Sequence, residues 1–364
     1  MTIASFSYQA LPAQVRFGRG TISCLADEAA RLSLDRLLVL CTPEQQDQAE
    51  RITELLGGRA AGVFAGAAMH TPVEVTERAL QLVRSTQADG VVSVGGGSAV
   101  GLGKAIALRT DLPQIAIPTT YAGSEATPIL GQTENGLKTT QRTLKVLPEL
   151  IIYDVDLTMK LPLTMSLTSG FNAIAHAAEA LYAIDGNPVI DIMAEQGIAA
   201  LAQALPRIRE RIDDADGRTL ALYGAWLCGS CLGAVGMALH HKICHTLGGT
   251  FDLPHAQTHA IMLPHTLAYN LPAAPRARER LARALESADP ARALAELAVL
   301  LEMPRALKDV GMPEDGIEKA AELATRNPYA NPRPVERDAI EAMLRRAWAG
   351  ALPAEDGTSV YARI

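Results

Sequence analysis

Six of the eight histidines in this 364-residue sequence lie between positions 240 and 265. They are His240, His241, His245, His255, His259 and His265. His241 and His245 are four residues apart, so a helix would place both rings on one face. Asn172 and His176 form an earlier pair with the same spacing. Imidazole binds divalent metals and also acts as an acid or cation near neutral pH, so the spacing leaves both chemistries open.

Two interpretations of these side chains compete. One is a metal site built from His176, His241, His255 and a fourth ligand. The other is a cluster of imidazoles that binds and protonates an anionic substrate. The remaining histidines of the segment are interpreted as structural core residues: His240, His259 and His265.

A glycine triplet marks a second candidate site. It stands between an apolar, β-branched run at residues 90–94 and a run of helix formers at 99–108. The turn consists of Gly95, Gly96, Gly97 and Ser98. Glycines let a backbone approach a large anion closely, and the following helix directs free N–H groups toward it. The turn therefore predicts a phosphate site, with Lys104 of the helix as phosphate support.

Hydroxyl side chains follow two other predicted strands. Thr119 and Thr120 come directly after the strand 114–117, where ligands bind in doubly wound sheets. Thr42 follows the strand 36–41, and no carboxylate stands there to hold a ribose 2′-hydroxyl or to repel a 2′-phosphate. We therefore expect a nicotinamide cofactor, with NADPH accepted as well as NADH.

Composition and charge exclude several classes of protein. The formal net charge is −7 and no long basic run occurs, which argues against nucleic acid or an anionic membrane surface as a partner. Cysteines are few and odd in number, so no disulfide framework is expected, and Cys228 and Cys231 are interpreted as buried thiols. No apolar run is long enough to cross a bilayer. We expect a protein of the reducing cytoplasm.

Alternating strand and helix signals run from residue 15 to about residue 118. This rhythm predicts a parallel sheet with helices on both faces. Residues 119–143 predict a loop and hairpin, and a last strand follows at 150–155. From residue 162 onward nearly all signals are helical, and helical spacing predicts single helices over 276–301 and 303–310. We expect two domains, residues 1–160 and 161–364, with the chemistry in a cleft between them.

These motifs, in this order, resemble the iron-containing alcohol dehydrogenase superfamily. The matching segments are Val15–Gly20, Gly95–Ser98, Pro118–Thr120, Asn172-x-x-x-His176, His241-x-x-x-His245 and Pro254-His255. The resemblance covers almost the whole chain. It implies a dehydroquinate synthase-like fold, with an α/β N-terminal dinucleotide-binding domain and an all-α C-terminal domain. It also implies a metal held by an Asp and a His four residues apart and by two later histidines.

The sequence departs from that family pattern at two positions. Asn172 stands where the family has its metal-binding Asp, and Gly101 where an Asp usually follows the glycine triplet. These changes, together with segments 120–125 and 331–334, resemble the maleylacetate reductase branch of the family. An amide in place of a carboxylate removes a negative charge that would offset a divalent cation. We therefore expect no bound metal.

The branch implies NADH- or NADPH-dependent reduction of the C=C bond of 2-maleylacetate, a dicarboxylate, to 3-oxoadipate during aromatic breakdown. Charge developing on the ketone oxygen needs a donor, and we assign His245 as the leading acid or oxyanion partner. The other catalytic groups expected around it are Asn172, His176, His241 and His255. Tyr121 and Arg333, the latter in a loop stiffened by prolines, are candidates to bind the substrate.

Other functions stay open at this point. One is a metal-dependent alcohol or polyol dehydrogenase of the same fold, which Asn172 argues against. Another is a catalytically idle cofactor-binding protein, which the dense histidine cluster argues against. The family also implies a homodimer.

Overall fold

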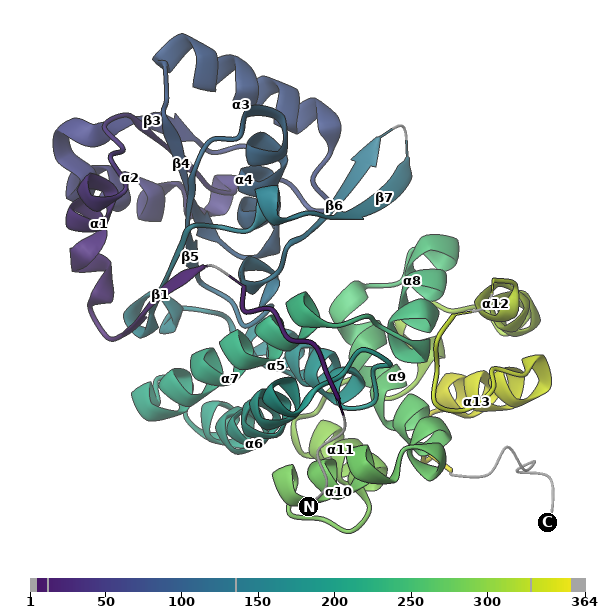
Figure 1. Cartoon of the computed structure of the whole chain (residues 1–364). Coiled ribbons are helices and arrows are strands. Elements are labelled where there is room, and N and C mark those ends of the chain that lie inside the picture. Colours follow the sequence, from purple (N-terminus) through teal and green to yellow (C-terminus); the bar gives the residue numbers. More distant parts are fainter. Residues whose placement is uncertain (1–4, 12, 135, 328, 355–364) are drawn as a thin grey trace. The chain divides into compact units, whose positions relative to one another are not determined.

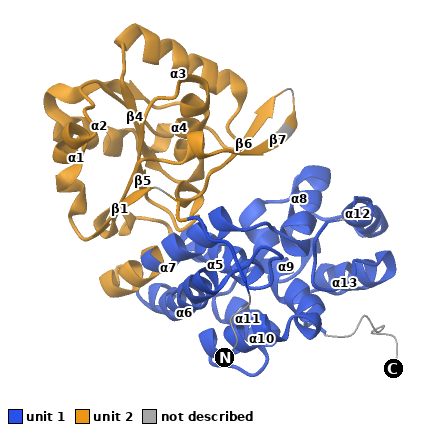
Figure 2. Ribbon diagram, viewed as in Figure 1, with its two compact units in different colours: residues 1–9, 163–212, 223–364 blue, residues 10–162, 213–222 orange. Residues whose placement is uncertain are grey.

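The structure is a computed structural model that describes residues 5–11, 13–134, 136–327 and 329–354. It divides into two compact units (Figures 1 and 2). The sheet unit comprises residues 10–162 and 213–222, and the helical unit comprises residues 1–9, 163–212 and 223–364. The expected division at residue 160 stays a prediction, since segment 213–222 clusters with the sheet unit.

A six-stranded, all-parallel sheet forms the centre of the sheet unit, in the order β1-β8-β5-β4-β2-β3. The strands are β1 (Gln14–Gly18), β2 (Leu37–Leu40), β3 (Ala60–Phe64), β4 (Gly90–Gly95), β5 (Gln114–Pro118) and β8 (Leu150–Asp154). The four inner strands β8, β5, β4 and β2 are buried along their whole length, as expected when helices cover both faces, whereas the edge strands β1 and β3 are mostly half-buried. The predicted parallel α/β sheet is confirmed.

Alternate residues of the strands serve two separate cores. Leu37 and Val39 of β2 pack in one cluster with apolar residues of α1 (Leu25–Arg31) and α2 (Gln46–Leu56). Leu38 and Leu40 pack in the other, with α3 (Val73–Thr86) and α4 (Gly97–Thr110). This two-residue alternation places a helix pair on each face of the sheet. The predicted hairpin also forms, from β6 (Ile129–Glu134) and β7 (Leu137–Arg142).

The helical unit contains the elements that carry the histidines (Figure 1). Its helices are α5 (Leu163–Ala180), α6 (Pro188–Glu210), α7 (Ala215–Ala234), α8 (Leu239–Phe251), α9 (His255–Asn270), α10 (Pro275–Ala284), α11 (Pro290–Leu300), α12 (Gly316–Thr325) and α13 (Arg337–Ala349). α5 packs against α6 and α9, and α8 packs against α9. The predicted helical second half is therefore confirmed.

Some helix boundaries differ from the sequence prediction. The expected helix 276–301 is two helices, because Glu286 takes a left-handed φ of 51° and Pro290 begins α11. The expected helix 303–310 is only a 3₁₀ turn at Leu307–Val310. Within the described residues no single helix is long and apolar enough to cross a membrane, although the bent pair α7–α8 reaches that length and composition jointly.

The first turns of α7 belong to the sheet unit because of a buried arginine. Arg218 is fully buried and donates to the carbonyl of Leu161 at 3.0 Å and to the hydroxyl of Tyr121 at 3.1 Å. Charge-assisted bonds of this kind are strong when desolvated. Burial raises the pKa of the Tyr121 hydroxyl, which therefore stays protonated. Tyr121 is thus engaged inside the sheet unit, which does not support its expected contact with substrate.

Candidate active site

The glycine turn joins β4 directly to α4. Gly95 has a φ of +142°, a conformation that favours glycine. A Cβ on Gly96 would lie 2.9 Å from the Thr120 methyl group, whereas a Cβ on Gly97 would lie 3.9 Å from Ser124 Oγ, at ordinary contact distance. No side chain caps the N-terminus of α4. Its first N–H groups are therefore available to an anion beside Gly97.

Hydrogen bonds bring the predicted threonines to this turn. The Thr119 amide donates to the Gly95 carbonyl at 3.0 Å. Gln45 donates to the Thr119 hydroxyl at 3.0 Å, and the Thr42 hydroxyl lies 3.4 Å from the Gln45 carbonyl oxygen. The ends of β2, β4 and β5 thus present the predicted cofactor residues side by side, and Gln45, which the sequence analysis missed, connects them.

Lys104 lies elsewhere than expected. Its ammonium group is buried and donates to the carbonyls of Ser124, Thr127 and Ile129 at 2.6–2.9 Å. Burial lowers the pKa of Lys104 to about 7. The side chain holds the loop after Thr120, and these contacts do not support its expected role in phosphate binding.

Six imidazoles form one cluster inside the helical unit. They are His176 of α5, His240, His241 and His245 of α8, and His255 and His259 of α9. Ring centroids are 5.1 Å apart for His176 and His241, and 4.3 Å apart for His255 and His259. His245 stands 6.0 Å from both His241 and His255. The structure therefore brings the expected catalytic histidines together and adds His240 and His259.

One chain of hydrogen bonds runs through the cluster to a buried carboxylate. Asn172 Nδ2 lies 3.2 Å from His176 Nε2, and His176 Nδ1 lies 2.9 Å from His241 Nε2. His241 Nδ1 contacts Glu179 Oε2. The sequence analysis missed Glu179. Its position three residues after His176 on one face of α5 is the signal that could have found it.

A second chain fixes the protons of two inner histidines. The Thr266 hydroxyl lies 3.1 Å from the carbonyls of Met262 and Leu263 and from His240 Nδ1. We assign its one hydrogen to a carbonyl, which makes it the acceptor of a bond from His240 Nδ1. His240 Nε2 is then a lone pair, to which His259 Nδ1 donates at 3.0 Å. His259 Nε2 is consequently also a lone pair, buried and without a hydrogen-bond partner among the described residues. Burial lowers the pKa of both imidazoles, which stay neutral.

These neutral buried histidines predict an acid-sensitive fold. Burial holds the pKa of His240 and His259 well below the ordinary 6.5, and that of His265 at about 4. At a pH between the pKa of such a histidine in the folded protein and its pKa of about 6.5 in the unfolded chain, the unfolded chain binds more protons. The free energy of unfolding therefore falls as the pH drops below about 6.5. Each group contributes about 1.4 kcal/mol per pH unit in that window. Urea unfolding at pH 7.5 and 5.5 should show this loss of stability. In His265→Gln the loss should be smaller by the contribution of one histidine. An unfolding free energy that is equal at both pH values would contradict the assignment.

The metal positions implied by the family resemblance do not suit an ion as these side chains are arranged. Both ring nitrogens of His241 are engaged, by His176 and by Glu179. Asn172 offers only a neutral amide where a carboxylate would offset the charge of an ion.

Another group of possible ligands lies beside them. In the described part of the chain, possible ligand atoms of His240, Cys244 and His259 come within 4.8 Å of one another. The bond between His259 and His240 occupies two of these donors. Burial raises the pKa of the Cys244 thiol well above its ordinary value, which opposes a thiolate ligand. This group therefore also offers poor ligands in the arrangement observed.

Arg333 lies in a loop tied to the ends of α8 and α9. Asn331 exchanges two hydrogen bonds with Asn270 and accepts the Leu239 amide. The Arg333 guanidinium stacks 4.3 Å from the centre of the Tyr269 ring and borders a cavity of about 170 Å³. These contacts hold Arg333 in place within the helical unit.

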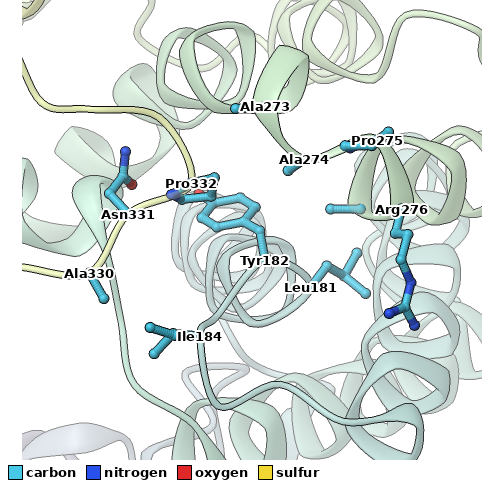
Figure 3. A pocket seen from close by; sticks show the side chains of 11 residues that line it. Leu181, Tyr182, Ile184, Ala273, Ala274, Pro275, Arg276, Ala330, Asn331 and Pro332 are labelled. Atoms are coloured by element: carbon cyan, nitrogen blue, oxygen red, sulfur yellow. The ribbon is translucent and has the colours of Figure 1, made fainter. Parts of the chain in front are cut away.

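A larger cavity, of about 420 Å³, opens nearby in the same unit (Figure 3). Most of its wall is apolar, and its polar members are Tyr182, Arg276 and Asn331. None of the predicted site residues lines it. The histidine cluster and this cavity are therefore separate features.

Comparison with known proteins gives consistent matches along the whole chain. Residues 12–155 match the iron-containing alcohol dehydrogenase family model, and residues 166–348 match the model of the C-terminal part of the Fe-containing alcohol dehydrogenase family. The maleylacetate reductase of Rhizobium sp. strain MTP-10005 is 57% identical over 96% of this chain and 99% of the relative. That of Sphingobium indicum is 54% identical over the same shares.

Solved structures agree with these matches. The crystal structure of maleylacetate reductase from Agrobacterium tumefaciens superposes with a TM-score of 0.94, at 55% identity, covering 96% of this chain and all of that one. An iron-containing alcohol dehydrogenase from Corynebacterium glutamicum gives 0.91 at 42% identity, covering 98% and 99%. This chain therefore belongs to the iron-containing alcohol dehydrogenase family, whose members are NAD(P)-dependent oxidoreductases.

Proposed function

We propose that this protein is a maleylacetate reductase, which reduces the C=C bond of 2-maleylacetate to give 3-oxoadipate. The observation that carries this proposal is the 50–57% identity, over 93–96% of the chain, to several proteins of that name. The histidine cluster supports it, because the reaction places negative charge on a ketone oxygen that needs hydrogen-bond donors.

NADH or NADPH, when bound, supplies a hydride to the alkene carbon β to the ketone. We assign the cofactor to the turn at Gly95, Gly96, Gly97 and Ser98, together with Thr42, Thr119 and Thr120. The uncapped N-terminus of α4 supports a phosphate there. Because the three residues directly after β2, Cys41-Thr42-Pro43, carry no carboxylate, we expect NADPH to be used as well as NADH. Initial rates that strongly favour NADH would contradict this expectation.

The chain's own groups then stabilise the enolate and deliver a proton to its carbon. A neutral imidazole has one N–H, and those of His176 and His241 are already used in the chain that ends at Glu179. We therefore do not assign His176 and His241, two of the expected catalytic histidines, as donors to substrate. His245 and His255, both exposed, are the histidines proposed to meet substrate. The second N–H of Asn172 is a further donor, and Arg333 is kept as a candidate for a substrate carboxylate.

We propose that the reaction needs no bound metal, since both ring nitrogens of His241 are engaged and Asn172 contributes no negative charge. Replacing Asn172 by aspartate should raise the affinity for Zn²⁺ or Fe²⁺, because a carboxylate adds the missing negative charge. Calorimetric titration of both proteins with each metal would measure the change. Elemental analysis of protein purified without an affinity tag provides the control, and near-stoichiometric iron or zinc in it would overturn the metal-free proposal.

The assay for the proposed function follows NADH absorbance at 340 nm with maleylacetate as substrate. Oxidation of NADH that persists in EDTA is expected. The family match favours one second candidate, a metal-dependent alcohol dehydrogenase. Activity on simple alcohols that EDTA abolishes, with none on maleylacetate, would support that candidate instead. We further propose a cytoplasmic homodimer.

A further inference from the structure

Glu179 is fully buried at the junction of α5 and α8 and has no assigned role. Its carboxylate accepts the backbone amides of His240 at 2.7 Å and His241 at 3.3 Å. It also contacts His241 Nδ1. These amides lie in the first turn of α8, whose N-cap residue offers no side-chain bond. Glu179 therefore caps α8 from outside and orients the His241 ring at once.

The Glu179 carboxylate also determines which group donates in each hydrogen bond that links it, through His241 and His176, to Asn172. An ionised carboxylate only accepts, so His241 carries its proton on Nδ1 and leaves Nε2 as a lone pair. His176 must then donate from Nδ1, at 2.9 Å, and keep a lone pair on Nε2. That lone pair, 3.2 Å from Asn172, requires the amide nitrogen rather than the amide oxygen to face it.

We propose that Glu179 is a positioning residue that fixes, through the two imidazoles, which end of the Asn172 amide faces His176. This proposal deepens the proposed function, on which it rests for the role of Asn172 toward substrate. With Glu179 in place, Asn172 keeps one N–H for a substrate oxygen. Its Oδ1 atom is buried and has no partner among the described residues.

Replacing Glu179 by glutamine should exchange donor and acceptor in each of these hydrogen bonds, while a side chain of the same length is kept. The glutamine oxygen still accepts the His240 amide, the shorter of the two capping bonds. Its NH₂ group faces His241 Nδ1 and gives up the 3.3 Å bond to the His241 amide. His241 must then shift its proton to Nε2, His176 must shift its own to Nε2, and Asn172 must rotate to present its oxygen. The N–H group of Asn172 that is proposed to donate to substrate then points elsewhere.

The first experiment reads tautomers in the wild-type protein. A ¹⁵N spectrum of histidine-labelled protein distinguishes protonated from bare ring nitrogens, and the variants His176→Gln and His241→Gln assign the two signals. We expect both rings to be protonated on Nδ1. A proton on Nε2 of His241 would overturn the proposal even if Glu179→Gln failed to fold.

The second experiment measures Glu179→Gln itself. We expect Nε2 tautomers for both histidines and a fall in kcat of about 10–100-fold, the usual cost of losing such a supporting carboxylate. NADH affinity should not change. Asp191→Asn is the matched control, since Asp191 is a buried carboxylate of the same unit, paired with Arg280 and remote in sequence from the histidines. It should keep wild-type kcat and tautomers.

Two results separate the failures. Wild-type kcat or unshifted tautomers in a folded Glu179→Gln variant would refute the positioning role. If the wild-type protein does not reduce maleylacetate although both rings carry their protons on Nδ1, the proposed function fails while the orientation by Glu179 stands.

Discussion

Replacing His245 by alanine is expected to lower kcat on maleylacetate by on the order of 10²–10⁴, the usual range for a lost general acid. His245 is exposed, whereas His240 and His259 are buried and neutral. Its ring stands 6.0 Å from both His241 and His255, at the outer edge of the cluster. Steady-state kinetics with saturating NADH measures the effect.

A second variant separates the two roles proposed for this ring. Glutamine at position 245 donates a hydrogen bond but does not transfer a proton. Partial recovery of kcat in His245→Gln would assign the side chain to enolate stabilisation, and no recovery would assign it to proton delivery. Because His245 is exposed, both variants should unfold at nearly the wild-type temperature. Near wild-type turnover of a folded His245→Ala variant would remove this residue from the mechanism.

Much of the fold follows from periodicity in the sequence. The runs 90–94 and 114–117 are apolar and β-branched, as fully buried parallel strands require, and helical spacing marks the second half. The sequence did not predict the break between α10 and α11, because the residue that takes the left-handed conformation there is Glu286 and not a glycine. Residue type alone does not report such a conformation.

The site could be predicted in part for a similar reason. Spacings of four residues on α5 and α8 placed Asn172 with His176 and His241 with His245 on shared faces, and the structure brings all four into one cluster. Glu179 was missed because attention to histidines does not reveal which carboxylate supports them. That relation depends on the packing of α5 with α8 and α9, a tertiary property.

Lys104, in contrast, was given a role that its contacts in the structure do not support. A lysine on the helix after a glycine turn is compatible with phosphate binding, but α4 is buried on several sides and its lysine points to a loop. The sequence did not indicate that carbonyl groups 20–25 residues later in the chain would accept the ammonium group.

Replacing Lys104 by methionine is therefore expected to destabilise the sheet unit by about 3 kcal/mol or more. Methionine fills a similar volume, but it leaves the carbonyls of Ser124, Thr127 and Ile129 buried without a donor, and each such group costs about 1–3 kcal/mol. Urea unfolding at pH 7 measures the loss. Lys145→Met is the control, because the exposed pair of Lys145 with Asp111 contributes about 1 kcal/mol at most.

The pH dependence gives this prediction a second, independent signature. Burial lowers the pKa of Lys104 to about 7 from 10.5. Between these values the unfolded chain binds more protons than the folded one, so this group makes the wild-type protein more stable as the pH rises from about 7 toward 10. Lys104→Met should lose that increment while Lys145→Met keeps it. A Lys104→Met variant as stable as wild type at pH 7 and pH 9 would show that the carbonyl groups find other donors, and that Lys104 does not hold the loop.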